Sequence, residues 1–334
     1  MEIPSSLINI AEKVGNDITL VQGPGGNISY KNKETMIIKA SGKKMSDARK
    51  RNIFVETNHK KIISAIENNE ADPIKNSWKE DSLMRPSIET TMHALMPHPY
   101  VLHVHCVNTL SWIVQKNYQN NLNIYLEDYN WISIPYRKPG LSLTNELKEP
   151  IKKSKANVIL LSNHGIIAGS DSAKNVFDII KSISKKLFTG EREKKKVYLK
   201  KLEKYLSCNK YKLPKYEYLH QIAYSFDHSK IATQGTIFPD QVVFLPNGIK
   251  NINTFEELIE LVNNRGDNIP VVIINNIGVL VPNNSTEVSE DILLGLFMTI
   301  LRIPTNTSIN YLTESDISDL INWDMEKHRQ MLNK

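Results

Sequence analysis

Residues 85–106, RPSIETTMHALMPHPYVLHVHC, predict a short helix that leads directly into a strand. Pro86 can open the helix, whereas Pro97 and Pro99 must close it, because proline lacks the N–H group that an inner helical turn needs. The segment YVLHVH then alternates in the way that is typical of a strand. Four of the nine histidines of the chain lie in this stretch, a density of imidazole that calls for a chemical explanation.

The two histidines of the predicted strand project to the same face. Residues two apart in a strand point the same way, so the rings of His103 and His105 can reach one point. Such a pair can chelate a divalent metal, although an isolated His-x-His is more often an ordinary surface or core feature. A third histidine, His164, and a carboxylate, Glu89, favour the metal interpretation. Glu89 also has a plainer interpretation, as a carboxylate stabilised by the start of a helix.

The segments around this unit predict further strands. GPGGNISYKNKETMIIKASG, residues 23–42, indicates a glycine-rich turn, a strand near residues 27–31 and a second strand over 35–40. ANVILLSNHGIIAGSD, residues 156–171, indicates strand, tight turn and strand, with a helix after residue 173. The GPGGN and ASG loops expose backbone N–H groups that can cradle a phosphate, and they could equally be simple hairpin turns.

The composition loosens after about residue 207, which predicts two domains, residues 1–210 and 211–334. In the second, we expect DQVVFLP (240–246) to form a strand, with Asp240 as a turn former before it. Residues 271–285 align without a gap with residues 158–172, and Ile277 stands at the place of His164. The second domain is therefore either a degenerate partial repeat or a chance recurrence of a glycine hairpin.

Composition excludes several classes of protein. The net charge of +6 comes from scattered basic residues, which does not favour a nucleic-acid partner. No apolar run reaches the roughly 18 residues of a membrane-spanning helix, and the first residues do not read as a signal peptide. The 2 cysteines are too few for a disulfide framework. We expect a cytoplasmic protein that binds neither membranes nor nucleic acids.

Five motifs, GPGGNISY, KASGKKM, PSIETTMH, HVH and SNHG, occur in this order within residues 5–190 and resemble the class II aldolase/adducin family. FPDQVVFL is similar to the extension of long bacterial members related to rhamnulose-1-phosphate aldolases. The resemblance implies an α/β fold, a three-layer α/β/α sandwich around a mainly antiparallel sheet, to which the second region adds a smaller α/β domain. It also implies that His103, His105 and His164 hold Zn²⁺ or another divalent metal and that Glu89 is the acid/base group. The implied phosphate contacts are Gly26, Asn27, Ser41, Gly42 and Ser87.

The expected function is that of a zinc-dependent aldolase, which cleaves or forms a carbon–carbon bond of a small ketose phosphate or related sugar acid through a metal-stabilised enediolate. An epimerase, dehydratase or decarboxylase could use the same site. An adducin-like binding module is disfavoured because the three histidines and Glu89 are intact. The resemblance also implies a homo-oligomer, since related enzymes complete their sites across subunit contacts.

Two features of the expected site stay open. Ile88 stands where aldolases of the family often have a second serine, so the anion is either a phosphate, with help from Lys43 or Arg85, or a carboxylate. The group that protonates the leaving aldehyde cannot be placed. Its candidates, by residue type alone, are Tyr216, Tyr218 and Tyr224.

Overall fold

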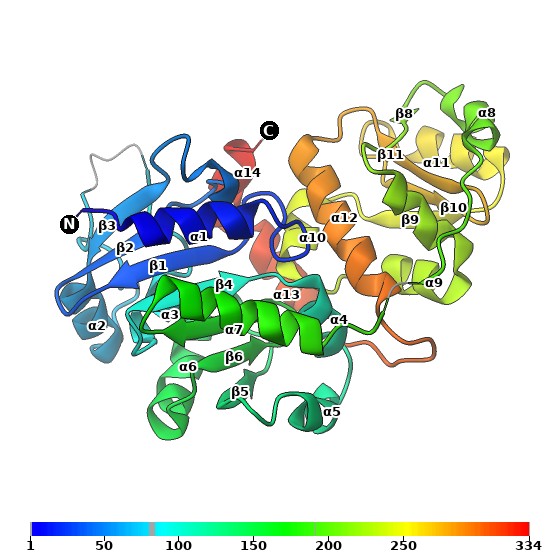
Figure 1. The fold of residues 1–334 in the computed structure, drawn as a ribbon. Helices are drawn as coiled ribbons and strands as arrows, with labels where there is room; N and C mark the ends of the chain where they lie inside the picture. The colour runs from blue at the N-terminus through cyan, green and yellow to red at the C-terminus, as the bar shows by residue number, and fades with distance from the viewer. Residues whose placement is uncertain (1, 80–83, 191, 334) are drawn as a thin grey trace.

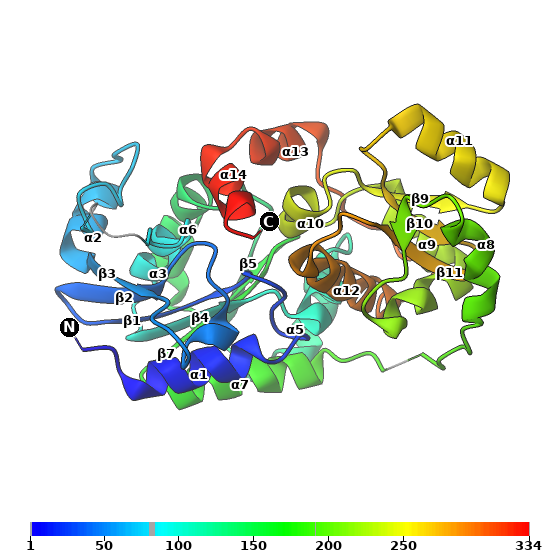
Figure 2. The same cartoon turned by 90° about the horizontal axis from the view of Figure 1, so that it is seen from above.

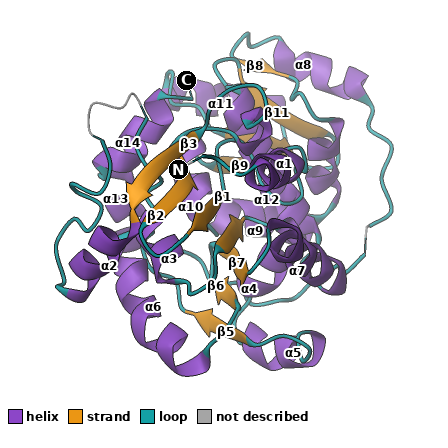
Figure 3. Cartoon of the chain, turned by 60° about the vertical axis from the view of Figure 1, so that its left-hand side comes forward, coloured by secondary structure: helices purple, strands orange, loops and turns teal. Residues whose placement is uncertain are grey.

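The larger sheet of the protein has seven strands. The structure is a computed structural model that describes residues 2–79, 84–190 and 192–333. From one edge to the other, the strands are β3 (Phe54–Asn58), β2 (Thr35–Lys39), β1 (Asn27–Lys31), β4 (Tyr100–Val104), β7 (Gly165–Ser170), β6 (Val158–Leu161) and β5 (Trp131–Ile134). All neighbours are antiparallel except β5 and β6. Figure 3 shows this sheet running from β3 to β5, with β1 and β7 near its middle.

Helices cover both faces of this sheet (Figures 1 and 2). One face carries α1 (Ser5–Gly15), α4 (Val107–Ile113) and α7 (Ala173–Lys186), and the other carries α2 (His59–Glu67), α3 (Thr90–Leu95) and α6 (Leu141–Ser154). The strands supply both cores, because Leu102 packs with the first set while Val101 packs against α3 and α6. The predicted three-layer sandwich around a mainly antiparallel sheet is confirmed. The short η1 (Met45–Asp47) and α5 (Tyr118–Tyr125) lie in the connections.

A second, smaller sheet lies in the C-terminal part of the chain. Its order is β8 (Tyr211–Lys212), β11 (Gly278–Pro282), β10 (Val271–Ile274) and β9 (Ile249–Ile252). Around it lie η2 (Leu199–Leu202), α8 (Glu203–Leu206), η3 (Glu217–Tyr224), α9 (Phe226–Gln234), α11 (Phe255–Arg265) and α12 (Glu287–Leu301). A separate apolar cluster joins Leu202 and Tyr205 to Val272 and Leu280. We propose this part of the chain as the second domain, and the boundary at residue 210 stays a prediction.

The last helices return to the larger sheet. In Figure 2, α13 (Glu314–Ile321) and α14 (Asp324–Met331) lie with α10 (Pro239–Phe244) beside its end, between the two sheets. The amide of Asn163, in the turn between β6 and β7, donates to the carbonyl oxygens of Ile237 (2.9 Å) and Asn310 (2.6 Å). The C-terminal part of the chain is thereby tied to the turn that carries His164.

The strand expected over residues 240–246 is wrong, because Pro239–Phe244 form helix α10. Pro239 occupies the first helical turn, where its missing N–H costs nothing, and Asp240 follows in the same turn. All six residues of α10 are buried, so the apolar run had no exposed face to reveal a helical period. Within the described residues, each helix is too short or too polar to span a bilayer.

Candidate active site

Three histidines from two neighbouring strands meet at one end of the larger sheet. His103 is the penultimate residue of β4, His105 follows that strand, and His164 lies in the turn from β6 to β7. Asn163, with φ 55°, makes this turn possible in a left-handed conformation that asparagine tolerates. The three side chains are buried, and one ring nitrogen from each lies within 4.8 Å of the others. The sequence-predicted ligand set is thus brought together.

An oxygen acceptor lies close to Nδ1 of two of these rings. His103 Nδ1 lies 3.1 Å from the carbonyl oxygen of Ile166, and His105 Nδ1 lies 2.9 Å from Asp240 Oδ2. Both oxygens can only accept, so in the neutral form of each ring the proton lies on Nδ1 and Nε2 is the potential ligand atom. The two Nε2 atoms lie only 3.2 Å apart. A proton on one ring can bridge this pair, and so can a shared metal cation.

These residues fit a divalent metal. Burial lowers the pKa of His103 well below its ordinary value, although the nearby Glu89 carboxylate acts in the opposite direction, so this ring stays neutral. Three imidazole nitrogens are a donor set that zinc and other late divalent metals accept. His164 Nδ1 is buried without a hydrogen-bond partner, whereas Nε2 of the same ring faces a carboxylate.

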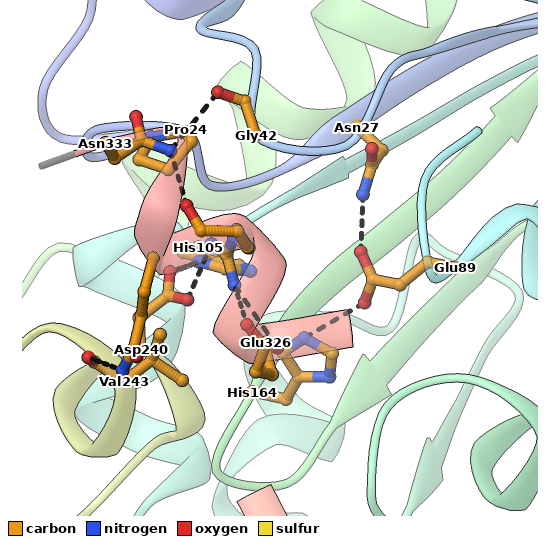
Figure 4. A network of polar contacts seen from close by, with 12 residues as sticks. Pro24, Asn27, Gly42, Glu89, His105, His164, Asp240, Val243, Glu326 and Asn333 are labelled. Carbon is orange, nitrogen blue, oxygen red and sulfur yellow. Dashed lines mark hydrogen bonds and ion pairs between the residues drawn. The ribbon is translucent and has the colours of Figure 1, made fainter. Parts of the chain in front are cut away.

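Glu89 faces the three imidazoles from the start of α3. Its Oε1 lies 3.1 Å from His164 Nε2 and 3.5 Å from His103 Nε2. The other oxygen, Oε2, accepts a hydrogen bond from Asn27 Nδ2 at 2.5 Å, and Ser87 Oγ accepts from the Glu89 backbone N–H at 3.2 Å. Figure 4 shows the carboxylate held between Asn27 and His164. Only 4% of Glu89 is exposed, so one oxygen is anchored while the other points at the metal position.

The predicted anion-binding residues line one small cavity beside Glu89. Its wall includes all five of them, Gly26, Asn27, Ser41, Gly42 and Ser87, and also Ile88, His105 and His164. Lys39 holds the two glycine-rich loops together, since its buried Nζ donates to the carbonyl oxygens of Pro24 (2.8 Å) and Lys43 (2.7 Å). A Cβ on Gly26 would come within 2.8 Å of the His103 carbonyl oxygen, so glycine allows this loop to approach β4.

Three charged residues of the cavity wall come from the C-terminal helices and were missed as site residues. They are Asp240 of α10 and the α14 pair Glu326 and Arg329. Arg329 Nη2 lies 2.7 Å from Asp240 Oδ1, and its Nη1 lies 3.3 Å from Glu326 Oε2. All three are buried. Their sequence signal was weak, because an acid and a base three apart on a polar helix normally indicate a solvated face.

Other candidates lie elsewhere. The described cavity wall does not include Lys43 or Arg85, and it includes none of the three tyrosines proposed as proton donors. Tyr216 donates to Asp291 Oδ1 (2.5 Å), and Tyr224 donates to the Ile277 carbonyl oxygen (3.0 Å). The side chain of His93 contacts Ser29 Oγ at 2.8 Å and is not part of the metal group.

The part of the chain that carries the three histidines and Glu89 matches a known protein family. The family model for the Class II Aldolase and Adducin N-terminal domain matches residues 6–186, more than half of the chain. The chain belongs to this family. The predicted family is therefore confirmed, while the closer relation to rhamnulose-1-phosphate aldolases stays a prediction.

Several proteins are similar to this class II aldolase/adducin chain. An uncharacterized oxidoreductase of Bacillus subtilis (strain 168), YuxG, is 26% identical over 188 residues, which cover 51% of this chain and 27% of that relative. The chain thus matches only about a quarter of that relative's length. The N-terminal class II aldolase domain of a conserved Thermoplasma acidophilum protein is 25% identical, with 56% of this chain and 94% of that chain covered and a TM-score of 0.48. L-fuculose-1-phosphate aldolase from Thermus thermophilus is 14% identical, with coverages of 55% and 93% and a TM-score of 0.39.

Proposed function

We propose that this protein is a zinc-dependent aldolase that cleaves or forms a carbon–carbon bond in a small ketose phosphate or a related sugar acid. One observation carries the proposal. The buried Glu89 carboxylate is anchored by Asn27 through one oxygen and turns the other toward a buried group of three imidazoles. An anchored carboxylate beside a cluster that fits a metal is the arrangement that proton transfer next to a carbonyl group requires.

The imidazoles of His103, His105 and His164 would hold the metal ion. When bound there, a divalent ion supplies Lewis-acid chemistry, which withdraws electron density from a substrate carbonyl. The three residues are at most 8% exposed, so charge interactions among them are weakened little by solvent.

Glu89 moves the proton in this proposal. In the synthetic direction, Oε1 takes the proton from the carbon next to the donor's carbonyl group, and the resulting carbanion attacks the carbonyl carbon of an aldehyde. The aldehyde oxygen becomes an alkoxide, which gains a proton from solvent or another acid to form the product's hydroxyl group. In the cleavage direction, Oε1 returns a proton to that carbon after the bond has broken. The hydrogen bond from Asn27 to Oε2 fixes the carboxylate while Oε1 is protonated and deprotonated.

The glycine-rich loops would bind the anionic end of the substrate. Gly26 and Gly42 border the cavity with positive φ values of 62° and 71°, a conformation that turns backbone N–H groups toward an anion. The hydroxyl groups of Ser41 and Ser87 lie on the same wall. One N–H of the Asn27 amide donates to Glu89, which leaves the second N–H of that amide for the anion.

A product assay tests the proposal. Purified protein, stripped of metal with a chelator and reloaded with zinc, would be incubated with ketose phosphates and sugar acids, and the products would be identified by mass spectrometry. An aldehyde together with a three-carbon fragment that carries a ketone group, formed only with added metal, is the expected result. An epimer, a dehydrated sugar or CO₂ in place of these fragments would assign the same site to one of the alternative reactions.

A further inference from the structure

A carboxylate from the C-terminal part of the chain lies directly behind one of the three histidines. Asp240 is 2% exposed, and its Oδ2 lies 2.9 Å from His105 Nδ1 (Figure 4). Its other oxygen, Oδ1, lies 2.7 Å from Arg329 Nη2. Each oxygen of Asp240 therefore has its own partner, the imidazole on one side and the guanidinium on the other.

The surrounding chain makes room for this contact. A Cβ on Gly25 would lie 3.0 Å from His105 Nδ1 and 3.2 Å from Asp240 Oδ2, so glycine leaves the imidazole and the carboxylate room to meet beside this loop. Asp240 stands in the first turn of α10, and Arg329 on α14 packs against it from the far side. Helices α10 and α14 thus bring a carboxylate and the guanidinium that pairs with it to the Nδ1 side of His105.

We propose that Asp240 is a positioning residue, which orients His105 for metal binding and is itself held in place by Arg329. This inference rests on the metal site of the proposed function. A carboxylate on Nδ1 fixes the proton there, leaves the Nε2 lone pair free for a metal and makes that nitrogen more basic. Asp240 lies outside residues 6–186, the part that matches the family, so the C-terminal part of this chain completes the metal site of the family domain.

A purely structural role is the alternative, because the Asp240–Arg329 pair also joins α10 to α14. Both roles predict that a substitution at Asp240 lowers the melting temperature. The two roles differ in how much added zinc raises the melting temperature. A positioning residue makes the rise in melting temperature on adding zinc smaller, whereas a structural pair lowers the melting temperatures of the metal-free and zinc-loaded proteins equally.

The experiment compares four variants of the full chain with the wild type. Asp240→Ala removes the carboxylate, and Asp240→Asn keeps its shape without its charge, which preserves a test if the alanine variant does not fold. Gln330→Ala is the matched control, because Gln330 Nε2 donates to the Val243 carbonyl oxygen and so joins the same two helices without touching His105. His105→Ala removes the ligand itself. Zinc affinity is measured by competition with a fluorescent chelator, and melting temperature is measured with and without zinc.

We expect Asp240→Ala to weaken zinc binding by about 10–100-fold, Asp240→Asn to weaken it less, and Gln330→Ala to leave it unchanged. The gain in melting temperature on adding zinc should shrink in the same order. Zinc affinities of both Asp240 variants within about threefold of the wild type, while His105→Ala loses binding, would overturn this inference alone. A wild type that binds zinc no better than His105→Ala would overturn the metal site and the inference together.

Discussion

Replacement of Glu89 by glutamine isolates the acid/base step. Glutamine has the same shape as glutamate, and its amide oxygen can take the place of Oε2, where Asn27 donates at 2.5 Å. The amide nitrogen then stands where Oε1 lies, 3.1 Å from His164 Nε2. An amide cannot take a proton from carbon at neutral pH, so the variant keeps the packing of the site and loses the base.

The expected loss in reaction rate follows from the role of Glu89 as a general base. A positioned general base contributes about 10²–10⁴-fold in rate, equivalent to roughly 3–5 kcal/mol of the activation barrier. Stability should fall far less, because the hydrogen bond from Asn27 to a charged carboxylate becomes one to a neutral amide, a difference on the order of 1 kcal/mol. Zinc content should stay near that of the wild type, since the three imidazoles are unchanged.

Proton exchange provides the sharpest assay. With the donor ketose phosphate in D₂O and no aldehyde present, the wild type should exchange the proton next to the carbonyl group, and Glu89→Gln should exchange it about 10²–10⁴-fold more slowly. Glu290→Gln is the matched control, since Glu290 is also buried but pairs with Lys212, away from the cavity wall. Exchange by zinc-loaded Glu89→Gln at more than a tenth of the wild-type rate would refute the assignment of Glu89 as the base.

Three further predictions concern the metal, stability and assembly. His103→Ala should lose bound zinc in metal analysis, whereas His59→Ala should retain it, and a full equivalent in His103→Ala would contradict the ligand set. Burial lowers the pKa of Lys31 from 10.5 to about 7, so between these values the unfolded chain holds a proton that the folded protein has released, and stability should rise with pH above about 7. The free energy of unfolding, measured with urea at pH 7 and pH 9, should rise by about 2 kcal/mol less in Lys31→Met than in the wild type. An equal rise in both proteins would contradict this prediction. Active protein should form a homo-oligomer in light scattering, and a single 38.1 kDa species would contradict that expectation.

The sequence contained most of the first sheet and its histidine cluster because both depend on local patterns. Alternation placed His103 and His105 on one face, and Asn163-His164-Gly165 marked a turn between two apolar strands. Both signals need only neighbouring residues. The five anion-binding residues came from the family's motifs, and the structure brings them to one wall.

The missed residues depend on packing between distant segments. Glu326 and Arg329 lie on α14 and are buried, with exposed fractions of 2% and 8% respectively. The polar sequence of this helix gives no sign of that burial. An exposed ion pair of this kind would contribute little to stability, whereas buried charges need partners. Asp240 provides the partner for Arg329 and was misread because the short apolar run after it has no periodicity that separates strand from helix.

The two hairpins suggest how the C-terminal part came to serve the first sheet. The order strand, helix, strand, strand, helix holds for β5, α6, β6, β7 and α7 and again for β9, α11, β10, β11 and α12, each with one parallel pair and one hairpin. This shared order supports the proposal of a partial repeat. In the second hairpin, Ile277 stands where the first hairpin has His164, and it packs at the edge of the apolar cluster. The imidazole of His220 lies beside this hairpin, but its Nδ1 accepts a hydrogen bond from the Val279 backbone N–H. With isoleucine at that place, the second turn offers no imidazole to a metal. Asp240 lies on α10, which precedes β9, so in our proposal the segment that leads into the second unit supplies the carboxylate beside His105.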